Sequence, residues 1–481
     1  MKKYIALFVL LIFSGSCSNS LEDLNVNTKD ATTAAAETFL NNATKNVFDI
    51  MSTIFPGANT QPDYQNVFRF FSQQLTQVTY IEESNYYIVE SQVSGSLWDL
   101  MYRDVLRDLD ESARVVSLEE VTLPQDILRK ENRMAVVETM TVLTFSILVE
   151  TFGDVPYSAS LDPDNVTPQF DDQQTIYYDL IDRLSRAIES MDVSAPGFER
   201  DIVYGGNMDR WKKFANSLKL KMGLRIMDVN PGLGSTTVTE AVQSGVFASN
   251  DDNFELEYLN TTPNTNPLWV ALVQSGRQYY VAAEPFVDTM NDLGDPRREA
   301  FFQTVGGDYI GGVYGQVQPY SSYSPMGTRF FEPDLPGIIM DYAYVEFLLA
   351  EAAERSLIST PAQGHYDAGI RASFEYYGVA GVDDYLAQAS VDYTTAPGDW
   401  KEKIGIQKWI SLYNQGFEAW TEYRRLGYPI LTAPPNAYIN EVPVRLTYPI
   451  SEQTLNQANY TAASSAIGGD LLTTHLFWDA N

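Results

Sequence analysis

The residues best suited to bind a ligand are aromatic, amide and charged side chains in irregular parts of the sequence. Flat rings offer apolar faces to the CH side of a sugar or to a peptide side chain, and amides or Arg satisfy hydroxyl or backbone groups. This composition predicts a site for a neutral, extended polar ligand, although most single rings of this kind serve to pack loops onto a core. The predicted contact residues are Tyr80, Tyr86, Tyr87, Asn266, Trp269, Arg277, Asp308, Tyr309, Tyr314 and Tyr320.

Motifs for catalysis or metal binding are missing from the sequence. It contains no HExxH, GxSxG or GxxxxGK[ST] pattern, and His365 and His475 lie far apart. A glycosidase-like pair of carboxylates stays open, because only spatial separation defines it. Asp162, Asp164 and Asn165 offer oxygen ligands for calcium, but the positions around them do not follow the EF-hand pattern. We therefore predict a binding protein without a cofactor or metal rather than an enzyme.

The charge balance narrows the possible partners. The 481 residues include 63 acidic and 32 basic side chains, which gives a net charge of −31. Such a chain repels nucleic acid and anionic lipid headgroups. We therefore predict neither as a ligand.

The amino terminus predicts export and lipid attachment. Lys2 and Lys3 precede an apolar run from Tyr4 to Phe13, which is too short for a permanent membrane span. Small residues then lead to Cys17, the only cysteine in the chain. This pattern is typical of a bacterial lipoprotein, with Ser14 in place of the usual Leu as the main departure; an ordinary signal peptide is the alternative.

The chain divides into three predicted segments. Residues 1–17 form the signal peptide that ends at the lipidated cysteine, and the polar residues 18–32 form a flexible tether. Residues 33–481 contain no obvious linker, so we predict one helical domain with a loop-rich insert at about 254–336.

Apolar residues at helical spacing must build the scaffold for these loops. The clearest signal is 400–429, predicted as one helix of roughly 35 Å that ends at Gly427. In 209–227, six basic residues are predicted to pair with carboxylates on a solvated face. The other predicted helices cover 39–51, 64–75, 97–116, 127–152, 176–191, 286–293, 337–357 and 366–377. Helices paired in this way are similar to degenerate tetratricopeptide repeats, and the fold class is all-α.

Together these features resemble the SusD/RagB family of Bacteroidetes outer-membrane nutrient-binding lipoproteins, in its second SusD-like branch. The resemblance covers nearly the whole mature chain. The segments that carry it are LEDLNVNT, FGDVPYS, RWKKFANSLKLKMGLR, NPLW, NDLGDPR, YAYVEFLLAEAA, QKWISLYNQGFEAWTEYRRLGYP, VPVRLTYPISEQTLNQANY and GGDLLTTHLFWDAN.

The resemblance implies a non-enzymatic protein at the cell surface, held by a lipid on the outer membrane. Such a protein captures an oligosaccharide and acts as the lid of a SusC-like TonB-dependent transporter. Uptake of an oligopeptide by the same kind of lid is an alternative. A helical-repeat scaffold that stabilises the transporter without touching substrate is another.

Overall fold

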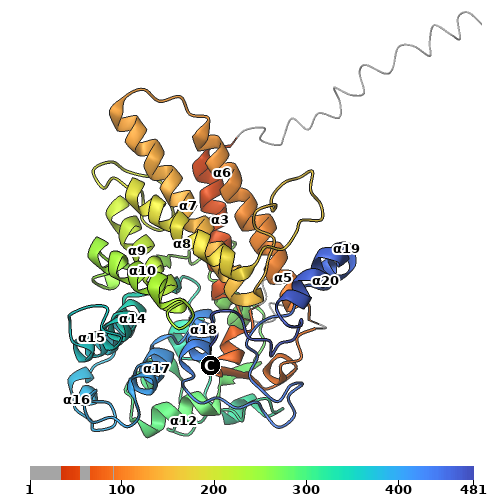
Figure 1. The fold of residues 1–481 in the computed structure, drawn as a ribbon. Coiled ribbons are helices and arrows are strands. Elements are labelled where there is room, and N and C mark those ends of the chain that lie inside the picture. Colours follow the sequence, from red (N-terminus) through yellow and green to blue (C-terminus); the bar gives the residue numbers. More distant parts are fainter. Residues whose placement is uncertain (1–33, 55–65, 90, 481) are drawn as a thin grey trace, which may run out of the picture.

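The structure is a computed structural model that describes residues 34–54, 66–89 and 91–480. The predicted signal peptide with Cys17 and the predicted tether lie outside the described residues. Helices dominate the fold: α6 and α7 project at one end, and α12 and α16 lie at the other (Figure 1). The prediction of an all-α protein is confirmed.

The first half of the chain is built from long helices. They are α3 (Ala36–Ser52), α4 (Phe68–Phe71), α5 (Val93–Leu100), the π-helical segment η2 (Met101–Leu106), α6 (Arg107–Ser117), α7 (Pro124–Phe152), α8 (Gln173–Ser190), α9 (Met208–Arg225) and α10 (Pro231–Ser244). Their capping follows the sequence. The side chain of Asp172 caps α8 and accepts from Thr175 N at 2.8 Å.

Shorter elements occupy the stretch predicted to be loop-rich. They are β2 (Phe254–Leu256), α11 (Pro267–Trp269), the π-helical η4 (Val270–Gln274), β3 (Tyr280–Ala282), α12 (Glu284–Asp292), α13 (Arg298–Phe301), and the 3-10 turns η5 (Tyr320–Ser322) and η6 (Thr328–Phe331). Two antiparallel strand pairs hold this stretch. Strand β3 pairs with β1 (Leu75–Gln77), and β2 pairs with β4 (Gly337–Met340). The β2–β4 pair therefore joins the two ends of the irregular stretch to each other, and the β1–β3 pair fastens its middle to the strand that follows α4.

Helices return in the last third. They are α14 (Tyr342–Glu354), α15 (Ala362–Tyr377), α16 (Val382–Leu386), α17 (Trp400–Ser411), α18 (Gly416–Leu426), α19 (Ile450–Leu455) and α20 (Gln457–Ala466). Sequential helices pack as pairs, with α7 against α8, α9 against α10 and α14 against α15. These pairs confirm the predicted tetratricopeptide-like arrangement.

The prediction of one helix over 400–429 is wrong. The chain breaks between α17 and α18, where Asn414 adopts a left-handed conformation with φ of 73°. Gly416 then begins α18 against the backbone of α4, and a Cβ at Gly416 would lie 2.7 Å from Arg69 N. The break lets two shorter helices pack on different neighbours, α17 on α14 and α18 on α4.

Two other predicted helices are shorter than their patterns. Of the stretch 64–75, residues 64 and 65 lie outside the described part, and only Phe68–Phe71 is helical before β1 begins. The predicted helix at 337–357 opens instead with the strand β4, because Asp341 caps α14 through its side chain, which accepts from Tyr344 N at 2.7 Å. Apolar periodicity alone does not separate a short buried strand from a helical turn.

Helix α7 forms the centre of the first half. It is long and apolar enough to cross a membrane by length and composition, but 89% of its most apolar window is buried inside the protein. Every residue from Val142 to Phe152 is buried. A helix covered all round in this way is a core helix of a globular domain.

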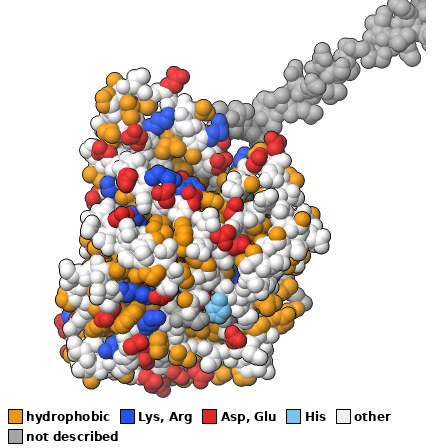
Figure 2. Space-filling model, viewed as in Figure 1, with side chains coloured by type: hydrophobic (Ala, Val, Ile, Leu, Met, Phe, Trp, Pro, Cys, Tyr) orange, Lys and Arg blue, Asp and Glu red, His pale blue; other side chains and the backbone are white. Residues whose placement is uncertain are grey.

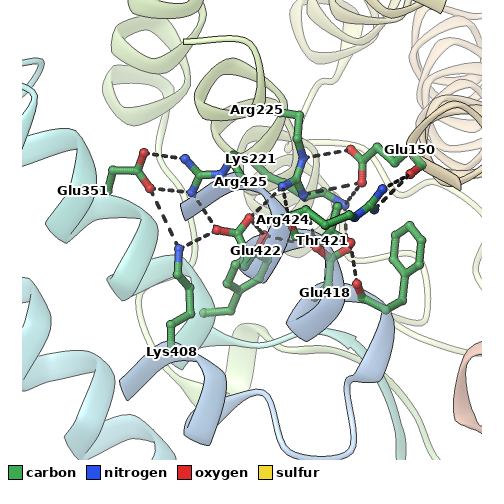
Figure 3. A network of polar contacts seen from close by, with 12 residues as sticks. Glu150, Lys221, Arg225, Glu351, Lys408, Glu418, Thr421, Glu422, Arg424 and Arg425 are labelled. Carbon is green, nitrogen blue, oxygen red and sulfur yellow. Dashed lines mark hydrogen bonds and ion pairs between the residues drawn. The ribbon is translucent and has the colours of Figure 1, made fainter. Parts of the chain in front are cut away.

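A buried cluster of charges joins five helices, α7, α9, α14, α17 and α18 (Figure 3). Every side chain of the cluster that forms an ion pair within it is at most 5% exposed. We call it the charge network, and it consists of Glu150, Glu351, Glu418, Glu422, Lys221, Arg225, Lys408, Arg424 and Arg425. Buried charges persist only when they are paired and hydrogen-bonded, so each helix fixes the positions of the others.

Glu422 is the most connected carboxylate of the network. Its Oε1 accepts from Tyr344 Oη at 2.8 Å and Arg225 Nη1 at 3.1 Å, and its Oε2 accepts from Lys408 Nζ and Arg425 Nη2, both at 2.6 Å. Burial alone would raise the pKa of Glu422, but the charges of Arg425, Lys408 and Arg225 hold it well below its usual range. Glu422 is therefore ionised in the folded protein.

The network also corrects the prediction for the bases of α9. Pairing with carboxylates is confirmed, since Lys221 lies 2.6 Å from Glu418 and Arg225 lies 3.1 Å from Glu422. The expected solvated face is wrong for these two bases, because both side chains are fully buried.

Asp341 gives the fold a specific pH dependence. Burial raises its pKa to about 6, although its carboxylate accepts from Tyr344 N and from Gln415 Nε2. An unfolded Asp titrates at about 4, so this group contributes roughly 3 kcal/mol of stability that is present below about pH 4 and is lost as the pH rises through about 6.

Asp341→Asn should therefore gain stability relative to the unmodified chain as the pH rises from about 4 to about 6. Asn keeps the acceptor for Tyr344 N and can donate to Gln415 Oε1 once that amide turns. Urea midpoints of both proteins across this range measure the difference. A difference that does not change with pH would contradict the prediction.

Candidate functional site

Four loops converge beside the β1–β3 pair. Val78 N donates to Tyr279 O at 2.8 Å and Gln318 N donates to Val78 O at 3.1 Å, so residues 277–282 and 313–318 lie against the end of β1. The fourth loop, 431–440, joins through Tyr438 N, which donates to Asn85 O at 2.8 Å. The loop at 79–92 thus lies at the centre of this group.

Polar contacts fix the shape of the loop at 79–92. Gln77 on β1 donates from Nε2 to Glu83 Oε2 at 2.7 Å, and its Oε1 accepts from Ser84 N at 3.0 Å. Asn85 Nδ2 donates to Gly315 O at 2.9 Å. The loop therefore presents its outer side chains from a rigid base, which lowers the entropy cost of binding.

Tyr80 forms the most exposed ring of the site. Its side chain is 63% exposed, and its ring meets that of Tyr279 edge to face, with centroids 5.5 Å apart and planes at 77°. The guanidinium of Arg277 lies 5.5 Å from the centroid of the Tyr279 ring. An exposed ring beside a cation and a second ring can stack on a sugar face while Arg277 donates to its hydroxyls.

The same loop contributes to a second aromatic pair. The rings of Tyr87 and Tyr438 have centroids 5.3 Å apart, and Tyr438 is 62% exposed. The aromatic loop surface is defined here as Tyr80, Tyr87, Arg277, Tyr279 and Tyr438. Two exposed rings on one rigid loop system suit an extended ligand that contacts both.

Three predicted contact residues are interior. Tyr86 is fully buried, receives Gln73 Nε2 on its hydroxyl at 3.0 Å, and packs against Tyr314. Tyr314 donates to Phe70 O at 2.6 Å. Asn266 caps α11 and donates to Leu335 O at 2.7 Å. In this structure these side chains hold the loops in place and do not face solvent, as packing rings commonly do.

The other predicted residues are at least partly exposed but are held by different neighbours. Tyr309 packs against Phe302 and lies under Arg298, and Asp308 precedes it on an exposed turn. Trp269 ends α11, which packs against α3 and η6. Tyr320 begins the turn η5 and is half-buried. The contacts of the structure group Tyr80 and Arg277 around Tyr279, pair Tyr87 with Tyr438, and leave Trp269, Asp308, Tyr309 and Tyr320 as separate predictions.

Tyr438 was absent from the predicted set. It lies in the segment TAPPNAYIN, where consecutive prolines and asparagines mark an irregular loop. That signal was available in the sequence. The contact with Tyr87 joins residues 351 positions apart, and no local pattern shows it.

Among residues 34–54, 66–89 and 91–480, no group of three or more His, Cys, Asp or Glu side chains could hold a metal ion. His365 lies 2.6 Å from Glu346 and His475 lies 3.1 Å from Asp479, so both have structural partners. On the face shown in Figure 2, Lys and Arg side chains lie close to Asp and Glu side chains, a pattern typical of a solvated surface.

Comparisons with solved structures place the chain among known folds. A structure titled as a chitin-binding protein has a TM-score of 0.79 and 26% identity, covering 92% of this chain and all of that one. A SusD homologue from Bacteroides fragilis has a TM-score of 0.77 and 25% identity, covering 93% and 99%. A chitin-binding SusD homologue from Flavobacterium johnsoniae has a TM-score of 0.77 and 24% identity, again covering 93% and 99%.

The sequence comparison agrees with the structural one. No curated protein sequence matches the chain. The profile of a SusD-like family, described as starch-binding and associating with the outer membrane, matches residues 27–449. This match covers most of the chain, and the chain therefore belongs to the SusD-like family of proteins associated with the outer membrane.

Proposed function

We propose that this protein captures a neutral oligosaccharide at the cell surface for nutrient uptake and performs no catalysis on it. The observation that carries the proposal is the aromatic loop surface, with the exposed ring of Tyr80 set edge to face on Tyr279 beside Arg277. The family description and the chitin-binding relative at 26% identity support a glycan as the ligand.

Calorimetry of residues 18–481 against chitohexaose and maltohexaose tests the proposal, with a mixed oligopeptide pool as the alternative ligand. Binding of either glycan supports the proposal. Binding of peptides alone would contradict the proposal and favour the alternative of a protein that binds oligopeptides.

Tyr80→Ala should weaken glycan binding by about 1–3 kcal/mol, because it removes the most exposed stacking ring without touching a buried contact. Tyr438→Ala should act in the same direction. Tyr178→Ala is the matched control, since Tyr178 is a half-buried ring on α8 beside Phe477. Equal affinity in Tyr80→Ala and the control would exclude Tyr80 from the site.

Delivery to a membrane transporter completes the proposal. We infer that a lipid on Cys17 holds the protein on the outer membrane, where it acts as the lid of a SusC-like TonB-dependent transporter. Closure of such a lid would enclose a weakly held ligand. Co-purification of the two proteins from membranes tests the partnership. Complex formation without any glycan binding would favour the alternative of a scaffold.

A further inference from the structure

A surface groove runs along α5 and the α19–α20 hairpin, which lie side by side in Figure 1. Two depressions of about 990 and 520 Å³ form it, and Asp99 and Arg103 line both of them. We call it the α5 groove. At one end it reaches Tyr438 of the aromatic loop surface, and at the other it reaches the loop at 156–168.

The rim of the groove carries exposed aliphatic side chains. Val89 is 44% exposed, Ile450 is 52% exposed and Leu471 is 61% exposed, and all three line the larger depression. Exposed apolar groups around one groove are typical of a protein interaction site. Sugars stack on aromatic faces, and Tyr438 and Tyr460 also line this depression, whereas the aliphatic side chains fit the apolar side chains of a polypeptide.

Two acidic and two basic side chains line the smaller depression. The acids are Asp99 and Glu452, and the bases are Arg103 and Arg107, of which Arg107 donates to Leu161 O at 2.9 Å and lies 3.5 Å from Asp110. Burial raises the pKa of each carboxyl, and the charge of Asp99 raises the pKa of Glu452 further. The nearby Arg103 already forms two bonds of 2.7 Å with Asp104. A basic side chain placed between Asp99 and Glu452 would relieve this repulsion.

We propose that the α5 groove binds an extended polypeptide segment of a partner protein, with aliphatic side chains against the rim and one Lys or Arg side chain between Asp99 and Glu452. The net charge of −31 favours the approach of a basic segment. The π-helical η2 begins directly after α5 and carries Arg103 into the groove wall, and such segments are frequent at functional sites. This proposal does not depend on glycan binding.

Selection from a random twelve-residue peptide library displayed on phage, with residues 18–481 as the target, tests the proposal. The selected peptides should combine aliphatic residues with a Lys or Arg. Anisotropy of the labelled consensus peptide should show at least tenfold weaker binding to Leu471→Asp and several-fold weaker binding to the near-isosteric Asp99→Asn. Val317→Asp is the control, because Val317 is 71% exposed and lies outside the groove lining.

Several results would overturn the proposal. The library could yield no binding peptide, or peptides without a basic residue, or peptides whose affinity is the same for Leu471→Asp, Asp99→Asn and the control. A glycan occupant is the other outcome: if both groove variants weaken chitohexaose binding as Tyr80→Ala does, the groove is part of the glycan site. If Tyr80→Ala loses glycan binding and keeps peptide binding, the two sites are separate. Either proposal can therefore fail without the other.

Discussion

Glu422→Gln should lower the free energy of unfolding by about 3–5 kcal/mol, the loss expected when one partner of a buried ion pair is removed. The amide keeps the shape of the carboxylate but loses its charge and turns an NH2 group toward donors. Lys408 then loses its contact of 2.6 Å and retains only Glu351 at 3.9 Å. Urea unfolding followed by circular dichroism measures the change.

Two further variants distinguish the effect of leaving a buried charge unpaired from the effect of removing a charge. Asp182→Asn removes the partner of Arg186 in an ion pair whose side chains are 61% and 62% exposed, and this should cost less than about 1 kcal/mol. Lys408→Met combined with Glu422→Gln should recover part of the loss, because no buried ammonium is left unpaired. Equal destabilisation by Asp182→Asn and Glu422→Gln would show that burial does not govern the network.

The sequence predicted the helical pairs because their signals are local. Apolar spacing and caps define α8 and α15, whose boundaries agree with the predicted ones within a few residues. Gly378 ends α15 in a left-handed conformation. The same local signals placed α12 correctly inside the irregular stretch.

The candidate site was only partly predictable, because ring exposure depends on distant partners. Tyr80 and Tyr86 lie six positions apart in one polar loop, yet one is 63% exposed and the other is fully buried. Tyr86 is enclosed by Gln73, Phe71 and Tyr314, and no sequence pattern near residue 86 predicts these contacts. Composition therefore indicated the irregular loops but could not tell exposed rings from packing rings.

The break between α17 and α18 has the same kind of cause. Arg69 on α4 is fully buried and donates from Nη2 to Asn414 O at 3.0 Å and Asn414 Oδ1 at 2.8 Å, across 345 positions of sequence. It also donates to Ser52 O at 3.1 Å and to Thr53 O, at the end of α3. Burial lowers its pKa to about 10, so Arg69 stays charged at neutral pH. One guanidinium therefore satisfies the carbonyl of Asn414, which a continuous helix over 400–429 would have paired internally, together with two carbonyls at the end of α3.

Arg69→Met should lower the free energy of unfolding by about 3 kcal/mol, because the carbonyls at the end of α3 and in the α17–α18 turn lose their charged donor. The stability of Arg69→Lys should lie between that of the unmodified chain and that of Arg69→Met, since one ammonium cannot reach every acceptor. Hydrogen exchange should rise first at residues 412–416 and then along 73–87, since α4 leads into β1 and Gln73 holds both Tyr86 Oη and Thr432 O. Glycan affinity should fall with that loosening, although Arg69 contacts no ligand. Unchanged exchange at 412–416 in Arg69→Met would show that the turn forms without Arg69, and the break would then have to originate in Asn414 and Gly416 themselves.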